Sequence, residues 1–289
     1  MTELDNATVS EEFTITVDPS EPDAPLLSKY VDVFLRNEVV ADATPDMRVL
    51  FYRGQADKAY NLTPNVFRKG LLEKEHTLIQ DMLLNSPSDF SEIHNTLERL
   101  VKMQHYGLPT RLLDVTTNPL VALYFACSEH ADRDGELFTF YDYLMHPKDL
   151  KAQLLAALSE YTGSSERQMI GFLSERGFSN VALTDLTSTQ YISIEAPQNN
   201  ERIKRQCGAF IVTGIRGGSE GNPFQKAKFD LRPILIKDFG DKIPRSIIIP
   251  KETKTKLLTE LNAIGINQAF IYPELEHQAA SIRIKHEEV

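Results

Sequence analysis

The chain has 289 residues, of which 42% are hydrophobic and 25% charged, a composition typical of globular proteins. Its formal charge of −10 has the wrong sign for a protein that tracks a nucleic-acid backbone, and the basic run at 202–205 is interpreted as a solvated face. No stretch approaches the ~18 consecutive apolar residues of a membrane span, so we expect no membrane partner.

The cysteines and the first residues suggest where the protein resides. Two cysteines, Cys127 and Cys207, cannot build a disulfide framework, and both are expected to be buried as small hydrophobic side chains. Residues 1–25 are polar and acidic without an apolar signal core, so we expect a flexible tail and a cytoplasmic protein.

Hydrophobic periodicity predicts one domain, residues 26–285, with a helical insertion near 148–185. Helices are predicted at 26–39, 73–85, 92–107, 118–132, twice within 151–177 with a break at 162–165, and at 251–266. Strands are predicted at 47–55, 111–116, 135–143, 190–197, from 209 onwards, and at 229–238 and 244–251. Because strands and helices do not alternate strictly, we expect an α+β fold with mixed or antiparallel central sheets flanked by helices.

The segment "FYRGQADKAYNLTPNVFR" places an arginine at the end of an apolar strand. The planar donor fork of Arg53 suits a phosphate or a ribose oxygen, and Gly54 would let a ligand approach the backbone. Gln55 adds a polar group beside them. Equally, Arg53 is able to pair with a carboxylate and order the fold.

The segment "QHYGLPTRLLDVTTNPLVALYFAC" gathers polar groups just before a helix that begins with Asn118 as N-cap and Pro119 at its first position. Free backbone N–H groups and the helix dipole suit an anionic or polar ligand there. The candidate binding residues are therefore His105, Tyr106, Thr110, Arg111, Asp114, Thr116, Thr117 and Asn118. In the structural alternative, Thr116 to Asn118 cap the helix and Asp114 pairs with Arg111 or His105.

These segments, together with "RIKRQCGAF" and "GINQAFIYPELEH", resemble the FRG domain family, named for its Phe/Tyr-Arg-Gly motif. The resemblance spans roughly residues 30–280, and the first motif here reads Tyr52-Arg53-Gly54. It implies a bacterial or phage-type cytosolic protein, often found in toxin or antiviral defence settings, but no settled activity.

A weaker resemblance is to ADP-ribosyltransferases of the arginine–serine–glutamate type, and it implies an ADP-ribosyltransferase-like fold. In those enzymes a strand arginine holds the ribose and phosphate of NAD, the substrate, and here Arg53 corresponds to it. Thr116 and Thr117 correspond to the hydroxyl motif. In the third element, the carboxylate ahead of a later strand, this sequence departs from the pattern, because Gln206 precedes the strand from Ala209 and the nearest carboxylate is Glu201. We rank Glu201 and Gln206 first as catalytic residues, with Glu274 behind them.

The leading hypothesis is an NAD-dependent transferase that modifies a protein or nucleic-acid acceptor with ADP-ribose, acting as a toxin or phage-defence effector. The alternative is an inactive FRG module that binds a nucleotide or a partner such as an antitoxin or a phage protein. A hydrolase that uses His105 and Asp114 as acid and base ranks lowest, because no nucleophile or metal set accompanies them.

Overall fold

The computed structural model describes residues 14–17, 25–43, 47–178, 191–197, 200–214, 231 and 244–274. Its strands form one seven-stranded sheet with the order β1-β7-β4-β2-β3-β6-β5 and an additional pairing between β4 and β5. The strands are β1 (Thr14–Thr16), β2 (Arg48–Gln55), β3 (Leu112–Thr116), β4 (Gly135–Met145), β5 (Tyr191–Glu195), β6 (Gly208–Thr213) and β7 (Ser246–Ile249).

The long strand β4 determines the shape of this sheet. One edge of β4 pairs with β2 from Glu136 to Tyr143, while the other edge is shared between β7 near Gly135 and β5 near Met145. As a result β4, β2, β3, β6 and β5 close into a ring, and β7 and β1 extend the sheet beyond it. The pairs β1–β7 and β4–β5 are parallel and the others antiparallel, which confirms the mixed α+β class.

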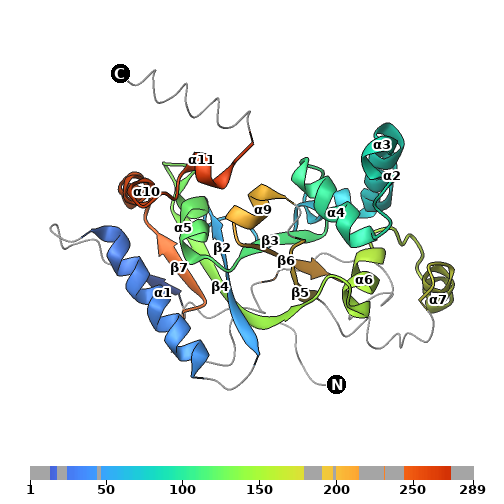
Figure 1. Cartoon of the computed structure of the whole chain (residues 1–289), viewed down its shortest axis with the longest axis horizontal. Coiled ribbons are helices and arrows are strands. Elements are labelled where there is room, and N and C mark those ends of the chain that lie inside the picture. The colour runs from blue at the N-terminus through green and yellow to red at the C-terminus, as the bar shows by residue number, and fades with distance from the viewer. Residues whose placement is uncertain are drawn as a thin grey trace.

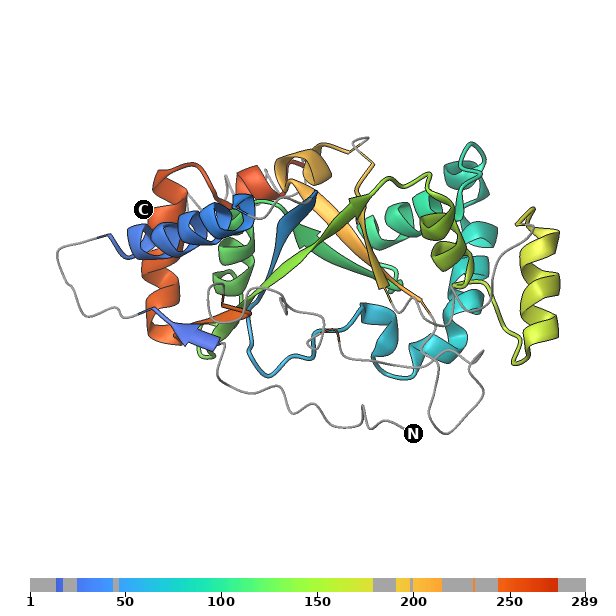
Figure 2. The same cartoon turned by 90° about the horizontal axis from the view of Figure 1, so that it is seen from below.

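The helices gather at the two ends of the sheet (Figures 1 and 2). At one end lie α1 (Leu26–Asp42), α5 (Pro119–Cys127) and α10 (Lys254–Ala263). At the other end lie α2 (Glu75–Asn85), α3 (Pro87–Phe90), α4 (Thr96–His105), α6 (Leu150–Ala157) and α7 (Glu166–Glu175). Between the two groups, the short helices α9 (Glu201–Arg205) and α11 (Gln268–Ile271) contact each other.

The alternation of side chains along β2 sends neighbouring residues into different cores. Leu50 and Tyr52 belong to the hydrophobic cluster that includes α1, α5 and α10, whereas Phe51 packs with residues of β3, β4 and β6. Arg53 is therefore directed to the same side of β2 as Phe51.

Helix α5 packs against the sheet at two glycines. A Cβ added to Gly54 would lie 1.8 Å from the carbonyl oxygen of Ala122, and one added to Gly135 would lie 2.4 Å from that of Ala126. Ala122 and Ala126 are one helical turn apart, so small residues on both surfaces allow the backbones to approach. Gly54 is thus required by helix–strand packing, independently of any ligand.

Most of the predicted elements are present, and the differences are local. Strand β1 lies inside the predicted tail, and the predicted strand at 229–238 lies almost wholly outside the described residues. Within the predicted insertion, α6 is a buried part of the core. Cys127 is buried as expected, but Cys207 is exposed, which corrects the prediction that both thiols are buried.

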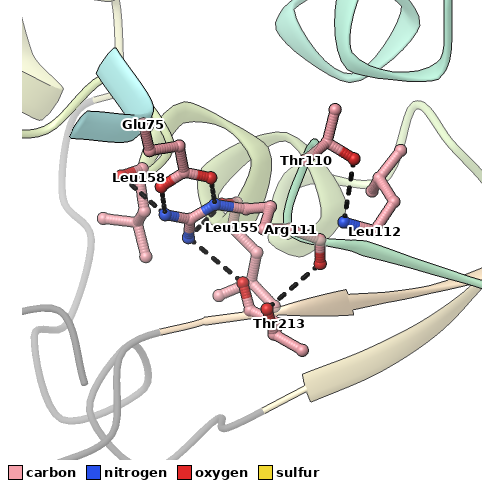
Figure 3. Close-up of polar contacts among 7 residues, drawn as sticks. All are labelled: Glu75, Thr110, Arg111, Leu112, Leu155, Leu158 and Thr213. Atoms are coloured by element: carbon pink, nitrogen blue, oxygen red, sulfur yellow. Dashed lines mark hydrogen bonds and ion pairs between the residues drawn. The ribbon is translucent and has the colours of Figure 1, made fainter. Parts of the chain in front are cut away.

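A buried arginine joins four of these elements just ahead of β3 (Figure 3). Arg111 is 1% exposed, and its guanidinium forms a bidentate ion pair with Glu75, the first residue of α2. It also donates to the carbonyls of Leu155 and Leu158 at the end of α6 and of Thr213 at the end of β6. All five N–H donors of Arg111 are therefore used within the fold.

We predict that Arg111→Met lowers the free energy of unfolding by about 3–5 kcal/mol, because the buried carboxylate of Glu75 loses its ion pair with Arg111. Urea denaturation measures this difference. The double variant Arg111→Met/Glu75→Leu removes both charges and should recover part of the loss. A single variant with wild-type stability would show that the ion pair does not stabilise the fold.

We also predict that Gly54→Ala lowers the free energy of unfolding by about 1–3 kcal/mol through overpacking against α5. Gly171→Ala is the matched control, because Gly171 lies inside α7 with open space around it and should gain about 0.5–1 kcal/mol. Equal stability of Gly54→Ala and the wild type would contradict the packing role of Gly54.

Candidate functional site

A cavity of about 450 Å³ opens where β2 and β3 diverge, a volume within the range of small-molecule sites. Only one residue pair, Tyr52 with Thr116, joins β2 to β3 in the sheet. The walls come from β2, the end of α4, β3, α5 and α9, with Phe210 of β6 and Tyr272 after α11. The cavity thus combines the segment 52–129 with residues from the last third of the chain.

Arg53 lies on the wall at the point where the β2–β3 ladder ends. Its Nη1 donates to the carbonyl oxygen of Asp114 at 2.7 Å, and its buried Nε has no hydrogen-bond partner. Within the described ranges no carboxylate forms an ion pair with it. Burial lowers the pKa of Arg53, an effect opposed by the carboxylate of Asp114, yet a guanidinium stays protonated at neutral pH. Arg53 therefore presents a cation with uncommitted donors to the cavity.

A second arginine, Arg202 of α9, also lines the cavity. Its guanidinium carbon lies 4.7 Å from the centre of the Tyr272 ring, a cation–π arrangement. Among the residues that the structure describes, none accepts a hydrogen bond from its guanidinium. Arg202 and Arg53 come from distant segments and are both available to an anionic ligand.

A chain of hydrogen bonds orients the polar side chains between α4 and β3. The hydroxyl of Thr110 donates to Oε1 of Gln104, and Nε2 of Gln104 donates to Oδ1 of Asp114 at 2.7 Å. Thr110 is buried behind the wall, so it acts by holding Gln104. The two residues that line the cavity, Gln104 and Asp114, are thereby fixed in position.

His105 lies at the edge of the cavity as a neutral imidazole. Asn200 caps α9 with its Oδ1, which accepts from the N–H of Arg202, so its Nδ2 faces Nε2 of His105 at 3.2 Å. Nε2 must accept this bond, which places the proton on Nδ1. Burial first, and then the charge of Arg202, lower the pKa of His105, while Glu274 acts in the opposite direction.

Glu274 is the carboxylate nearest to His105 in the described part of the chain. Its Oε1 lies 3.9 Å from Nε2 of His105, and its Oε2 is buried without a hydrogen-bond partner. The amide of Gln206 donates to the carbonyl of Ile271 at 3.0 Å and so ties α9 to the segment that carries Glu274. Gln206 therefore positions this segment.

The structure brings together only part of the predicted site. Six of the predicted residues line the cavity: Arg53, Gly54, His105, Asp114, Thr116 and Gln206. The hydroxyl of Thr116 donates to the carbonyl of Gln206 at 2.6 Å and accepts from the N–H of Asn118 at 2.9 Å, so it joins β3 to α9.

The other predicted residues do not line this cavity and have other contacts. Arg111 is fully engaged by the fold, Asn118 caps α5 at 3.0 Å as predicted, and Gln55 is buried with its Nε2 directed at the carbonyl of Asn61. Thr117 is exposed and points to the carbonyl of Cys207.

Glu201 also lies outside the cavity. It is exposed and pairs with Lys204 at 2.7 Å, one helical turn away. The carboxylate ranked first from the sequence is therefore not brought to Arg53, and Glu274 lies closer to the cavity residues. Tyr106, likewise outside this cavity, is 65% exposed on the far side of His105.

Sequence reasoning missed several residues of the wall, above all Gln104, Phe125, Arg202 and Tyr272. Gln104 precedes His105, and Arg202 stands in the quoted run "RIKRQCGAF", but that run reads as a solvated face. Only the contact between α9 and α11 shows that Arg202 and Tyr272 belong together.

Residues 48–135 match the family model of the FRG domain. An FRG domain is present in this chain. The matched FRG segment holds Arg53, Gln104, His105, Asp114 and Thr116, but ends before α9 and Tyr272. No curated protein and no solved structure gives a significant match.

Neither a metal site nor a membrane span is found in the described residues. They contain no group of three or more His, Cys, Asp or Glu side chains placed to hold a metal ion. None of their helices combines the length and apolar character needed to cross a bilayer.

We predict that His105 titrates with a pKa below 6.5, its ordinary value, because burial and Arg202 disfavour the imidazolium. NMR titration of the histidine ring measures it, with His105→Gln to assign the signal. Since the folded pKa lies below the unfolded one, the native state binds fewer protons, and stability falls as the pH drops below 6.5. A pKa above 6.5 would contradict this environment.

Proposed function

We propose that the cavity binds a nucleotide with two phosphates, with NAD⁺ as the substrate, and that the chain transfers ADP-ribose to a macromolecular acceptor. The observation that carries the proposal is the pair of arginines with uncommitted donors, Arg53 and Arg202, on the wall of one nucleotide-sized cavity. Guanidinium groups bind phosphate oxygens through two parallel hydrogen bonds. The aromatic rings of Phe125 and Tyr272, whose centres lie 6.4 Å apart, supply apolar surface for a planar ring of the ligand.

The proposed reaction breaks the bond between C1′ of the nicotinamide ribose and the nicotinamide nitrogen. Nicotinamide leaves as a neutral molecule with the bonding electron pair, and the acceptor nucleophile bonds to C1′ and loses a proton. A carboxylate stabilises the positive charge that develops on the ribose. Neither Glu274 nor Glu201 lines the cavity itself. We assign this role to Glu274, because it lies 3.9 Å from the cavity residue His105, whereas Glu201 is exposed and paired with Lys204.

Binding without chemistry is the second candidate. It is favoured by the neutral Gln206 in the cavity wall and by its amide being committed to the carbonyl of Ile271. In this case the FRG domain would recognise a nucleotide or a partner such as an antitoxin or a phage protein. Nicotinamide release separates the two candidates, because only the transferase produces it.

We predict that Arg53→Ala weakens NAD⁺ binding about 10- to 100-fold, the loss expected for a charged hydrogen bond of about 1.5–3 kcal/mol. Isothermal titration calorimetry measures the affinity. Arg36→Ala is the matched control, because Arg36 is exposed on α1 and pairs only with Asp32 in the described region. If Arg53→Ala bound NAD⁺ as the wild type does, the proposed site would be wrong.

We also predict that Glu274→Gln binds NAD⁺ with nearly unchanged affinity but releases nicotinamide at least about tenfold more slowly, because the carboxylate acts on the transition state. Glu201→Gln should retain the wild-type rate. Chromatographic measurement of nicotinamide decides between them. Slow nicotinamide release by Glu201→Gln but not by Glu274→Gln would assign the catalytic role to Glu201 instead. If the wild type released no nicotinamide, binding without chemistry would be the function that remains.

In a toxin or phage-defence setting, the transferase would consume the NAD⁺ of its host or modify a host target. Overexpression should therefore arrest growth, and Arg53→Ala should relieve the arrest.

A further inference from the structure

A second hollow of about 270 Å³ adjoins the cavity on the other side of His105. The two hollows share the lining residues Val101, His105 and Ile203, so they adjoin at these residues. The ligand of the first cavity and an occupant of the second would therefore lie next to each other beside His105. This arrangement is that expected of a donor site and an acceptor site for group transfer.

The second hollow is lined in part by apolar residues and carries one large exposed ring. Ile93, Val101, Pro197 and Ile203 contribute apolar surface, while Tyr106 is 65% exposed at its border. The Tyr106 ring meets His105 edge-on, at 5.1 Å between centres and an angle of 74°. This contact orients the ring and leaves much of it open to an incoming group.

The charges of the hollow favour a protein over a nucleic acid. Glu98 of α4 lines it, and within the described residues no cation pairs with its carboxylate. The other charge, Lys102, is committed, because its Nζ donates to the carbonyl of Asp89 and lies over the Phe90 ring. An unpaired carboxylate in a chain of net charge −10 repels a phosphate backbone but accommodates apolar or cationic side chains.

We propose that this second hollow is the acceptor subsite, and that it holds a segment of a protein substrate with an apolar or cationic side chain against Tyr106. The proposal rests on the proposed transferase function. It goes beyond that function by naming the class of acceptor and the surface that selects it.

The test uses the full chain, NAD⁺ labelled in the adenylate phosphate, and a cell lysate as the source of acceptors. Two products are measured together, namely released nicotinamide and label attached to macromolecules. Tyr106→Ala should lower the ratio of attached label to released nicotinamide about tenfold, the effect of losing an aromatic anchor at an interface. Water then replaces the protein acceptor, so nicotinamide release continues.

Tyr143→Ala is the matched control, because Tyr143 is an aromatic residue of β4 that is 55% exposed and lines neither hollow. It should keep the wild-type ratio. Protease digestion should release the attached label, and nuclease digestion should not.

Each outcome has one meaning. A wild-type ratio for Tyr106→Ala, with normal nicotinamide release, overturns the acceptor subsite and leaves the proposed function intact. Release of the label by nuclease overturns the protein class of the acceptor. No nicotinamide release by the wild type removes the transferase, and the acceptor subsite with it.

Discussion

The buried ion pair between Arg111 and Glu75 is the constraint on which the rest of the site depends. It ties the residue before β3 to the start of α2, the end of α6 and the end of β6. Because β3 begins at the residue after Arg111, these hydrogen bonds fix the position of Asp114 and Thr116 further along the strand. Burying the charges of Arg111 and Glu75 costs desolvation free energy, which is offset only when the charged groups are fully hydrogen-bonded. All five N–H donors of Arg111 have an acceptor.

The hydrogen bonds of three arginines distinguish the one that stabilises the fold from the two that are available to a ligand. Arg111 donates all its guanidinium hydrogen bonds to groups of the fold. Arg53 donates to the carbonyl oxygen of Asp114, and its buried Nε has no hydrogen-bond partner. In the described part of the chain, the guanidinium of Arg202 contacts only the ring of Tyr272, by a cation–π interaction. A buried donor without a partner costs free energy, so its retention in the cavity favours a ligand that completes it.

The sequence predicts much of this fold because local signals are strong where the site lies. The Asn118 cap and Pro119 mark the start of α5, and Gly107, with a φ of +88°, ends α4 as expected. The closing of the ring by β4 and β5 is not readable from local patterns, because it depends on pairing between strands far apart in the chain.

Side-chain partners are harder to predict than elements, and two of the predicted site residues that do not line the cavity show why. Arg111 and Arg53 are alike in sequence, because each accompanies an apolar strand. The distant Glu75 and three backbone carbonyls make Arg111 a structural residue. Glu201 has suitable spacing ahead of β6, but the helical turn of α9 turns it toward Lys204 instead. Tyr272 joins the cavity wall, and Glu274 approaches His105, through the contact of α11 with α9, which no short-range pattern predicts.

The most direct test of the central claim is a crystal structure of the full chain with ADP-ribose bound. The account predicts the two phosphates between Arg53 and Arg202, with Nε of Arg53 within hydrogen-bond distance of a phosphate oxygen and the five bonds of Arg111 unchanged. Phosphates bound elsewhere, or a guanidinium of Arg53 that still contacts only the carbonyl of Asp114, would contradict it.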